Sequence, residues 1–215
     1  MYGRQVGEQE LNFEASGALR DAALIMRDRE TDSWWSIMTS DAIGGDLDGT
    51  DLRELPYGEK TTWGDWKGRH PETLVLSVDG TEHLENNPYD NYFTSAGTFR
   101  DIGLADDRLD AKENIYTFWL EGRPFAVTHR AIEGGKTYRL DGLDERVAFF
   151  HRVPGLPMYA SSEAWLVGAG ATGMAGDEIL AAIRAGTLEG AERLTGFDTF
   201  WYTWVAVNRD TELLD

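Results

Sequence analysis

No cysteine occurs among the 215 residues of this chain. Disulfide bonds, thiolate metal sites and cysteine nucleophiles are therefore excluded for this sequence. The chain also lacks any run of about 18 apolar residues, so no membrane-spanning segment is predicted. Its first seven residues are polar and do not form the apolar core of a signal peptide. The sequence as it stands predicts a cytoplasmic protein, or an exported or surface-anchored one if a leader segment precedes it.

Positive charge is scarce. The chain has 38 acidic side chains against 20 basic ones, a formal net charge of −18, and only four lysines. A phosphate backbone requires a basic face, so nucleic acid is excluded as a partner. Self-repulsion of this size destabilises a compact state in dilute buffer, whereas molar salt screens it over roughly 3 Å. The composition therefore predicts a protein of a halophile.

Tryptophan and glycine are abundant, and two tryptophan pairs share one spacing. Trp63 and Trp66 with Thr73 align with Trp201 and Trp204 plus a second threonine, 138 residues further on and without a gap. This pattern indicates an internal repeat. We therefore predict a mainly β (α+β) fold of two related units, residues 1–105 and 106–215, in one compact domain. Each unit is expected to combine short antiparallel strands with one short tryptophan-bearing helix, and the first unit to lack its front strands.

Local patterns place the individual elements. Thr62 with Asp65 predicts a capped short helix ending at Pro71, and the apolar spacing of residues 177–185 predicts an amphipathic helix. Residues 22–26 and 34–38 are expected to form a hairpin, and residues 73–78 a buried strand. Four further strands are predicted at residues 116–120, 124–129, 136–140 and 146–151. Their regular spacing favours one antiparallel sheet.

Several segments together resemble a known family. They are residues 16–19 (SGAL), 26–35 (MRDRETDSWW), 61–66 (TTWGDW), 70–77 (HPETLVLS), 87–89 (NPY) and 108–113 (RLDAKE). In combination they resemble the uncharacterised DUF3179 family over nearly the whole chain. The resemblance implies no established activity. It also implies an upstream segment with a Cys-Pro-x-Cys motif, which this haloarchaeal-type sequence lacks.

Aromatic side chains supply the first candidate ligand site. Trp63, Trp66 and His70 share one face of the predicted helix. They could form a stacking platform for a sugar or planar ligand, although paired indoles more commonly pack into a core. A second candidate is the turn-rich segment 87–93, with Tyr89 and Tyr92. Each segment is a hypothetical ligand contact.

Acidic residues supply a second candidate. Asp28 and Arg29 lie in a turn cluster, which is more typical of an ion pair than of a catalytic group. A pair of carboxylates such as Asp28 and Asp41 would be needed for a hydrolase. The stretch from Asp46 to Asp51 does not have the ligand spacing of an EF-hand.

No catalytic residue, metal site or cofactor is predicted. The four histidines show no zinc spacing, although His129 and His151 end neighbouring predicted strands and could meet in the fold. Ser16, Ser161 and Ser162 lie in no nucleophile elbow, so no Ser-His-Asp triad is argued. Three functions remain open: a non-catalytic binding or scaffold module with an unknown ligand, a metal-handling or redox-associated protein whose cysteines lie upstream, and a hydrolase with paired carboxylates.

Overall fold

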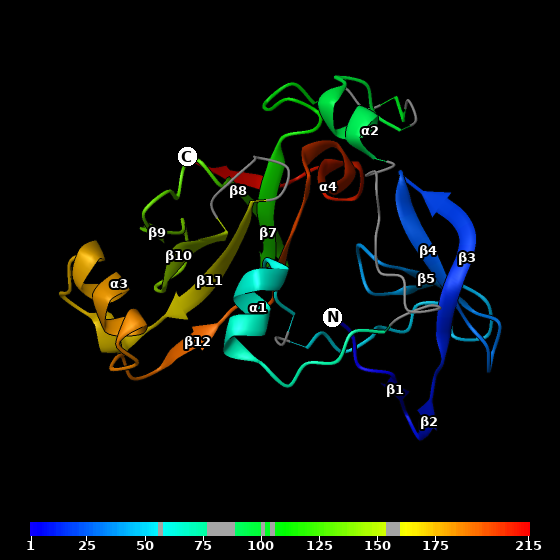
Figure 1. The fold of residues 1–215 in the computed structure, drawn as a ribbon, viewed down its shortest axis with the longest axis horizontal. Helices are drawn as coiled ribbons and strands as arrows, with labels where there is room; N and C mark the ends of the chain where they lie inside the picture. Colours follow the sequence, from blue (N-terminus) through cyan, green and yellow to red (C-terminus); the bar gives the residue numbers. More distant parts are fainter. Residues whose placement is uncertain (56–57, 77–88, 100–101, 104–105, 154–159) are drawn as a thin grey trace.

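The computed structural model describes residues 1–55, 58–76, 89–99, 102–103, 106–153 and 160–215. Short antiparallel strands dominate these ranges, with a few short helices between them (Figure 1). The prediction of a mainly β fold is confirmed. Within the same ranges, no helix combines the length and the apolar character required to cross a bilayer.

The N-terminal sheet is an antiparallel meander. Its strands are β3 (Phe13–Arg20), β4 (Ala23–Asp28), β5 (Trp34–Ser36) and β6 (Ala42–Gly44), hydrogen-bonded in that order. A small hairpin of β1 (Gln5–Val6) and β2 (Gln9–Glu10) precedes it. Asp21 and Ala22 have φ values of 50° and 62°, the left-handed backbone of a tight hairpin turn. Leu11, Trp35 and Leu52 form a separate apolar core beneath this sheet.

Two more sheets enclose the largest core. The middle sheet has the order β13 (Gly196–Phe200), β7 (Asn114–Leu120), β8 (Arg123–Thr128) and β14 (Glu212–Leu214), with β14 parallel to β8. The outer sheet has the order β12 (Ala191–Arg193), β11 (Ser161–Val167), β10 (Arg146–Val153) and β9 (Lys136–Arg139). Phe118, Phe125 and Phe149 pack together in the core that these two sheets share.

One helix covers the outer sheet, and another is buried between two sheets. α3 (Gly176–Arg184) packs Ile179 and Leu180 against the outer sheet, next to the 3₁₀ turn η2 (Ala169–Ala171). α4 (Trp201–Val207) lies between the middle and N-terminal sheets (Figure 1). Its Trp201 and Trp204 pack with Met38 of the N-terminal part and Ile115 of β7 in one cluster. That cluster joins the first half of the chain to the second.

The two remaining helices are short and peripheral. α1 (Trp63–Arg69) begins after Thr62, whose side chain accepts a hydrogen bond from the Asp65 backbone, so the predicted cap is confirmed. α2 (Asp90–Thr94) lies near α4 at the top of the view (Figure 1). Neither helix has a buried residue.

The structure corrects three predictions. Residues 73–76 form no strand, and Leu74 and Leu76 are 93% and 92% exposed. Residues 77 and 78 lie outside the described ranges. The four strands expected in one sheet divide in pairs, β7 and β8 in the middle sheet and β9 and β10 in the outer sheet. The expectation that both tryptophan pairs pack into a core is wrong for the first pair, because Trp63 is 49% exposed.

The two tryptophan helices nevertheless share local geometry. Both have seven residues, and their C-caps His70 and Asn208 have nearly equal backbone angles, φ −132°, ψ 70° and φ −129°, ψ 66°. Thr73 and Thr211 each donate a backbone hydrogen bond to the carbonyl of that cap residue. Their surroundings differ, because α4 is buried and α1 is exposed. The internal repeat and the division at residue 105 stay predictions.

Candidate functional site

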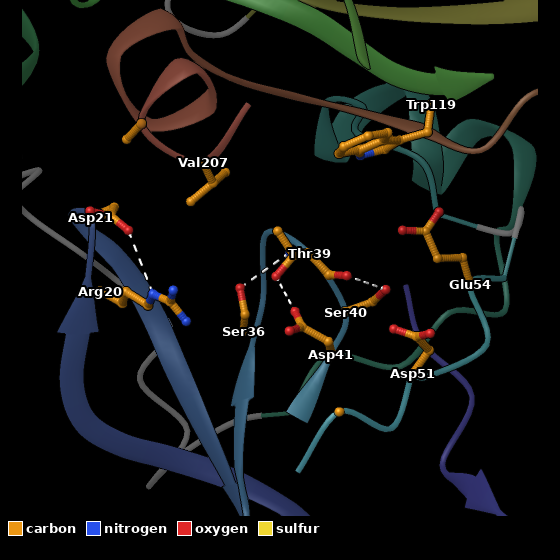
Figure 2. A pocket seen from close by; sticks show the side chains of 12 residues that line it. Arg20, Asp21, Ser36, Thr39, Ser40, Asp41, Asp51, Glu54, Trp119 and Val207 are labelled. Carbon is orange, nitrogen blue, oxygen red and sulfur yellow. Dashed lines mark hydrogen bonds and ion pairs between the residues drawn. The ribbon is translucent and has the colours of Figure 1, made fainter. Parts of the chain in front are cut away.

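A wide cavity opens between the N-terminal sheet and the end of β7 with α4. It has a volume of about 710 Å³. Loops after β3, β5 and β6 supply its polar wall, and α4 with Trp119 of β7 supplies the opposite, more apolar wall (Figure 2). Its lining residues are Arg20, Asp21, Ser36, Thr39, Ser40, Asp41, Gly49, Asp51, Glu54, Trp119, Ala206 and Val207.

Backbone hydrogen bonds hold two of the four lining carboxylates in place. Asp41 and Asp51 face each other in an isolated antiparallel bridge. The backbone amides next to them complete this bridge, Ala42 to the Thr50 carbonyl at 2.8 Å and Leu52 to the Ser40 carbonyl at 2.9 Å. The two side chains therefore project from a fixed piece of backbone, which favours a preorganised site.

The charge of the cavity is negative. Asp21, Asp41, Asp51 and Glu54 line it, against one guanidinium, that of Arg20, which lies 3.7 Å from Asp21. Burial raises the pKa of Glu54 above its ordinary value. A cationic ligand near Glu54 would lower this pKa again, because an opposite charge favours the ionised carboxylate.

Trp119 provides an aromatic surface in the same cavity. Its side chain is 38% exposed, and its ring meets that of buried Trp204 edge-to-face at 5.8 Å between centroids. The indole is thus supported from the core and still presents area to the cavity. Carboxylates beside a fixed indole suit an ammonium or guanidinium group, through charge-assisted hydrogen bonds and a cation–π contact.

Asp28 has a structural position instead. It has no exposed surface, and its carboxylate accepts hydrogen bonds from Trp35 Nε1 at 2.8 Å, from the amide and hydroxyl of Thr31 and from the amide of Ser33 at 3.2 Å. Asp28 does not line the cavity that contains Asp41. The hydrogen bonds give the Asp28 carboxylate a structural role, and a catalytic pair of Asp28 and Asp41 stays a prediction. Arg29 is exposed and forms an ion pair at 2.8 Å, but its partner is Glu14 of β3 rather than an acid of the turn.

Trp63, Trp66 and His70 do gather at α1. His70 and Trp66 have ring centroids 4.2 Å apart, and the Arg69 guanidinium lies 5.5 Å from the Trp66 ring centre. Trp66 Nε1 donates to Thr73 Oγ1 at 3.0 Å. The His70 ring and the Arg69 guanidinium thus already contact the Trp66 ring, on which a ligand would have to stack.

Tyr89 and Tyr92 lie apart from both other groups, at α2. The hydroxyl of Tyr92 is 2.8 Å from that of Tyr202 on α4, and Lys112 Nζ lies 4.3 Å from the centre of its ring. Tyr92 therefore connects α2 to the core helix. Residues 87 and 88 of the predicted aromatic segment lie outside the described ranges. The predicted ligand residues thus fall in three separate places.

A cluster of buried polar residues lies elsewhere, where the middle and outer sheets meet. His129 follows β8, Ser162 is on β11 and Asp198 is on β13. His129 Nδ1 is 2.6 Å from Ser162 Oγ, and His129 Nε2 is 3.5 Å from Asp198 Oδ1. The histidine and aspartate side chains are each 6% exposed. His151 stacks on His129 with 5.7 Å between ring centroids, so the predicted meeting of these imidazoles is confirmed.

Burial shifts the pKa values of His129 and Asp198 in opposite directions, each in favour of the neutral form. The pKa of His129 is lowered to about 3. Burial is the largest cause, and the charges of His151 and Lys60 act in the same direction. Burial raises the pKa of Asp198 to about 6, although a hydrogen bond from Ser161 and the charge of Lys60 oppose the shift. At pH 7 the imidazole is neutral and the carboxylate is ionised. A neutral imidazole next to a hydroxyl can accept its proton, but with a pKa of about 3 this imidazole is a much weaker base than one whose pKa lies near the working pH.

A family model described as "Protein of unknown function (DUF3179)" matches residues 1–211. The chain belongs to the DUF3179 family. The resemblance seen in the sequence motifs is therefore confirmed. No curated protein and no solved structure shows a significant match to this DUF3179 chain.

Sequence reasoning missed the Ser162–His129–Asp198 cluster of this DUF3179 protein. The three residues come from β11, from β13 and from the turn after β8, and they match no contiguous motif. The available signal was polar residues inside apolar strands, such as Asp198 between Phe197 and Thr199. In the described part of this chain, no three histidine or acidic side chains gather as metal ligands would.

Proposed function

We propose that this DUF3179 protein is a binding protein, and that the cavity between its N-terminal sheet and α4 takes a small ligand with an ammonium or guanidinium group. One observation carries the proposal: four carboxylates and the Trp119 indole line a single cavity of about 710 Å³. A volume of this size is typical of small-molecule sites, which range over about 300–1,000 Å³. The fixed bridge of Asp41 and Asp51 supports a preformed site.

Isothermal titration with a panel of small amines tests this proposal, using spermidine, arginine and choline as probes. Trp119→Ala is expected to weaken binding about tenfold, because a partly desolvated cation–π contact contributes about 1–2 kcal/mol. Asp51→Asn removes one charge from an exposed position of the cavity and is also expected to weaken binding.

Trp34→Ala is the matched control, because Trp34 is similarly exposed on β5 but does not line the cavity. Its affinity for the amines should equal that of the unchanged protein. If no amine in the panel binds, or if Trp34→Ala weakens binding as much as Trp119→Ala does, the proposal is wrong.

We further propose that the protein is a haloarchaeal-type member adapted to high salt. Its net charge of −18 supports this, since self-repulsion is screened only at high ionic strength. The melting temperature is expected to fall by roughly 10 °C or more between 2 M and about 0.1 M KCl, which corresponds to a few kcal/mol for a chain of this length. Differential scanning calorimetry at constant pH measures the change, and an unaltered melting temperature would exclude the adaptation.

A further inference from the structure

We infer that Ser162, His129 and Asp198 form a second functional site, in which Ser162 is a nucleophile, His129 its general base and Asp198 a positioning residue, and that this site hydrolyses small esters. The site shares no lining residue with the acidic cavity. It therefore goes beyond the proposed binding function, and each can fail without the other.

The geometry of the imidazole defines the direction of proton transfer. At 2.6 Å from Nδ1, the Ser162 hydroxyl is placed to donate to that nitrogen. The neutral ring then carries its hydrogen on Nε2, which has no hydrogen-bond partner among the described residues and lies 3.5 Å from Asp198. Such contacts are often long in a free enzyme and shorten in the reacting complex. When Nδ1 takes a proton, the positive ring is attracted to the carboxylate.

Two further contacts fix Asp198. The Ser162 amide donates to Asp198 Oδ1 at 3.2 Å, and Ser161 also forms a side-chain hydrogen bond to this carboxylate. Ser162 in turn lies opposite His151 in the register of β11 and β10. The nucleophile and the carboxylate are thus held by strands, and the base lies in the turn directly after β8, which favours precise positioning.

A cavity beside the cluster provides room for a substrate. It has a volume of about 240 Å³, and Ser161, Ser162, Asp198 and Lys60 all line it. Lys60 donates from Nζ to the Ala160 carbonyl at 3.0 Å, so its positive charge is held at the residue before β11, two residues before Ser162. Such a charge can stabilise an oxyanion that forms on the substrate. The small volume selects short acyl groups.

The reaction follows the order known for a nucleophile paired with a base. Ser162 Oγ forms a bond to the ester carbonyl carbon while its proton passes to His129 Nδ1. The bond from that carbon to the leaving oxygen then breaks, and the leaving alkoxide takes the proton and departs as an alcohol. Water attacks the acyl-serine and gives one proton to Nδ1. That proton returns to Ser162 Oγ as the carboxylic acid leaves, so ester and water become acid and alcohol.

Labelling with a fluorophosphonate reagent tests the nucleophile, because such reagents phosphonylate an activated serine. Peptide mapping by mass spectrometry is expected to find one adduct, on Ser162. His129→Gln should slow labelling by about 100-fold or more, the usual contribution of a general base. Ser95→Ala, at the exposed end of α2, should label at the rate of the unchanged protein.

Near-ultraviolet circular dichroism establishes that each variant is folded, and labelling of the unchanged protein needs no variant at all. Absence of an adduct on the folded protein, an adduct on another serine alone, or an unaltered rate in folded His129→Gln would each overturn the inference. Equal rates of hydrolysis of a short-chain p-nitrophenyl ester by the unchanged protein and by Ser162→Ala would also overturn it.

The role of Asp198 has its own measurement. Lys60, Arg152, Ser161 and His129 face this carboxylate, and burial raises its pKa to about 6. The labelling rate of the unchanged protein should therefore rise with pH through about 6, as Asp198 ionises, and this rise should be absent in Asp198→Asn. If Asp198 had only a structural role, Asp198→Asn would alter the melting temperature but keep the rise in labelling rate near pH 6. That result would contradict the assignment of Asp198 as a positioning residue.

Discussion

Replacing Asp28 with alanine is expected to lower the free energy of unfolding by about 3–5 kcal/mol, as when one partner of a buried charged network is removed. The substitution leaves the indole N–H of Trp35, the amide and hydroxyl of Thr31 and the amide of Ser33 without their acceptor. Thr31 and Ser33 lie in the turn that joins β4 to β5, and Trp35 lies on β5 itself. We therefore expect the N-terminal sheet to lose its order first.

Urea unfolding in molar salt, followed by tryptophan fluorescence, measures the loss. Asp28→Asn keeps one accepting oxygen and should lose less than Asp28→Ala. Asp46→Ala is the control, because Asp46 is an exposed acid of the same half and should change stability by less than about 0.5 kcal/mol. Equal losses in Asp28→Ala and Asp46→Ala would refute the structural assignment of Asp28.

The effect of Asp28 should also depend on pH. Burial acts to raise the pKa of Asp28, but the hydrogen bonds from Trp35, Thr31 and Ser33 outweigh it and hold the pKa below the ordinary value of 3.8. Because the folded pKa is lower than the unfolded one, the stabilisation is complete above the unfolded pKa. It is lost as the pH falls through the folded pKa. The difference between the unchanged protein and Asp28→Ala should therefore narrow in acid.

Trp201→Ala and Trp63→Ala should have very different effects, although the two residues match in the sequence repeat. Trp201 is fully buried, and the Arg108 guanidinium lies 4.8 Å from its ring centre. Removal of a buried tryptophan costs about 3–5 kcal/mol, from lost burial and the cavity left behind. Trp63 is 49% exposed, so Trp63→Ala should cost less than about 1 kcal/mol.

Calorimetric and urea unfolding of both variants in the same buffer measure this contrast. Near-equal losses would mean that α1 is as firmly packed as α4, contrary to the structure. A large loss for Trp201→Ala alone would agree with two helices that share a local design but have separate roles. In that design, α4 joins the sheets, and α1 stays at the surface.

Much of the local structure could be predicted from the sequence. The cap at Thr62, the amphipathic helix α3 and the strands β7 to β10 all arise from residues close together in the chain. Side-chain spacing and turn residues decide such elements locally. Residues 73–76 are the exception: an apolar run predicted a buried strand, but the described fold offers it no neighbouring strand.

The candidate sites could be predicted far less well. Asp41 was recognised as a possible functional carboxylate, but its partner in the cavity is Asp51 and not Asp28. Trp119 gave no signal in the sequence, because an indole in a strand is usually core. Its partial exposure depends on where α4 and the N-terminal sheet end.

The sequence by itself determined the family, the mainly β class, the strong negative charge and the positions of most helices and strands, because these follow from composition and short-range patterns. Only the tertiary structure decided which strands share a sheet, which tryptophan helix is buried and which polar residues meet. Ser162 and His129 are 33 residues apart, and Ser162 and Asp198 are 36 residues apart. Contacts over such separations depend on how whole sheets pack, and a local pattern of residues contains no information about that packing.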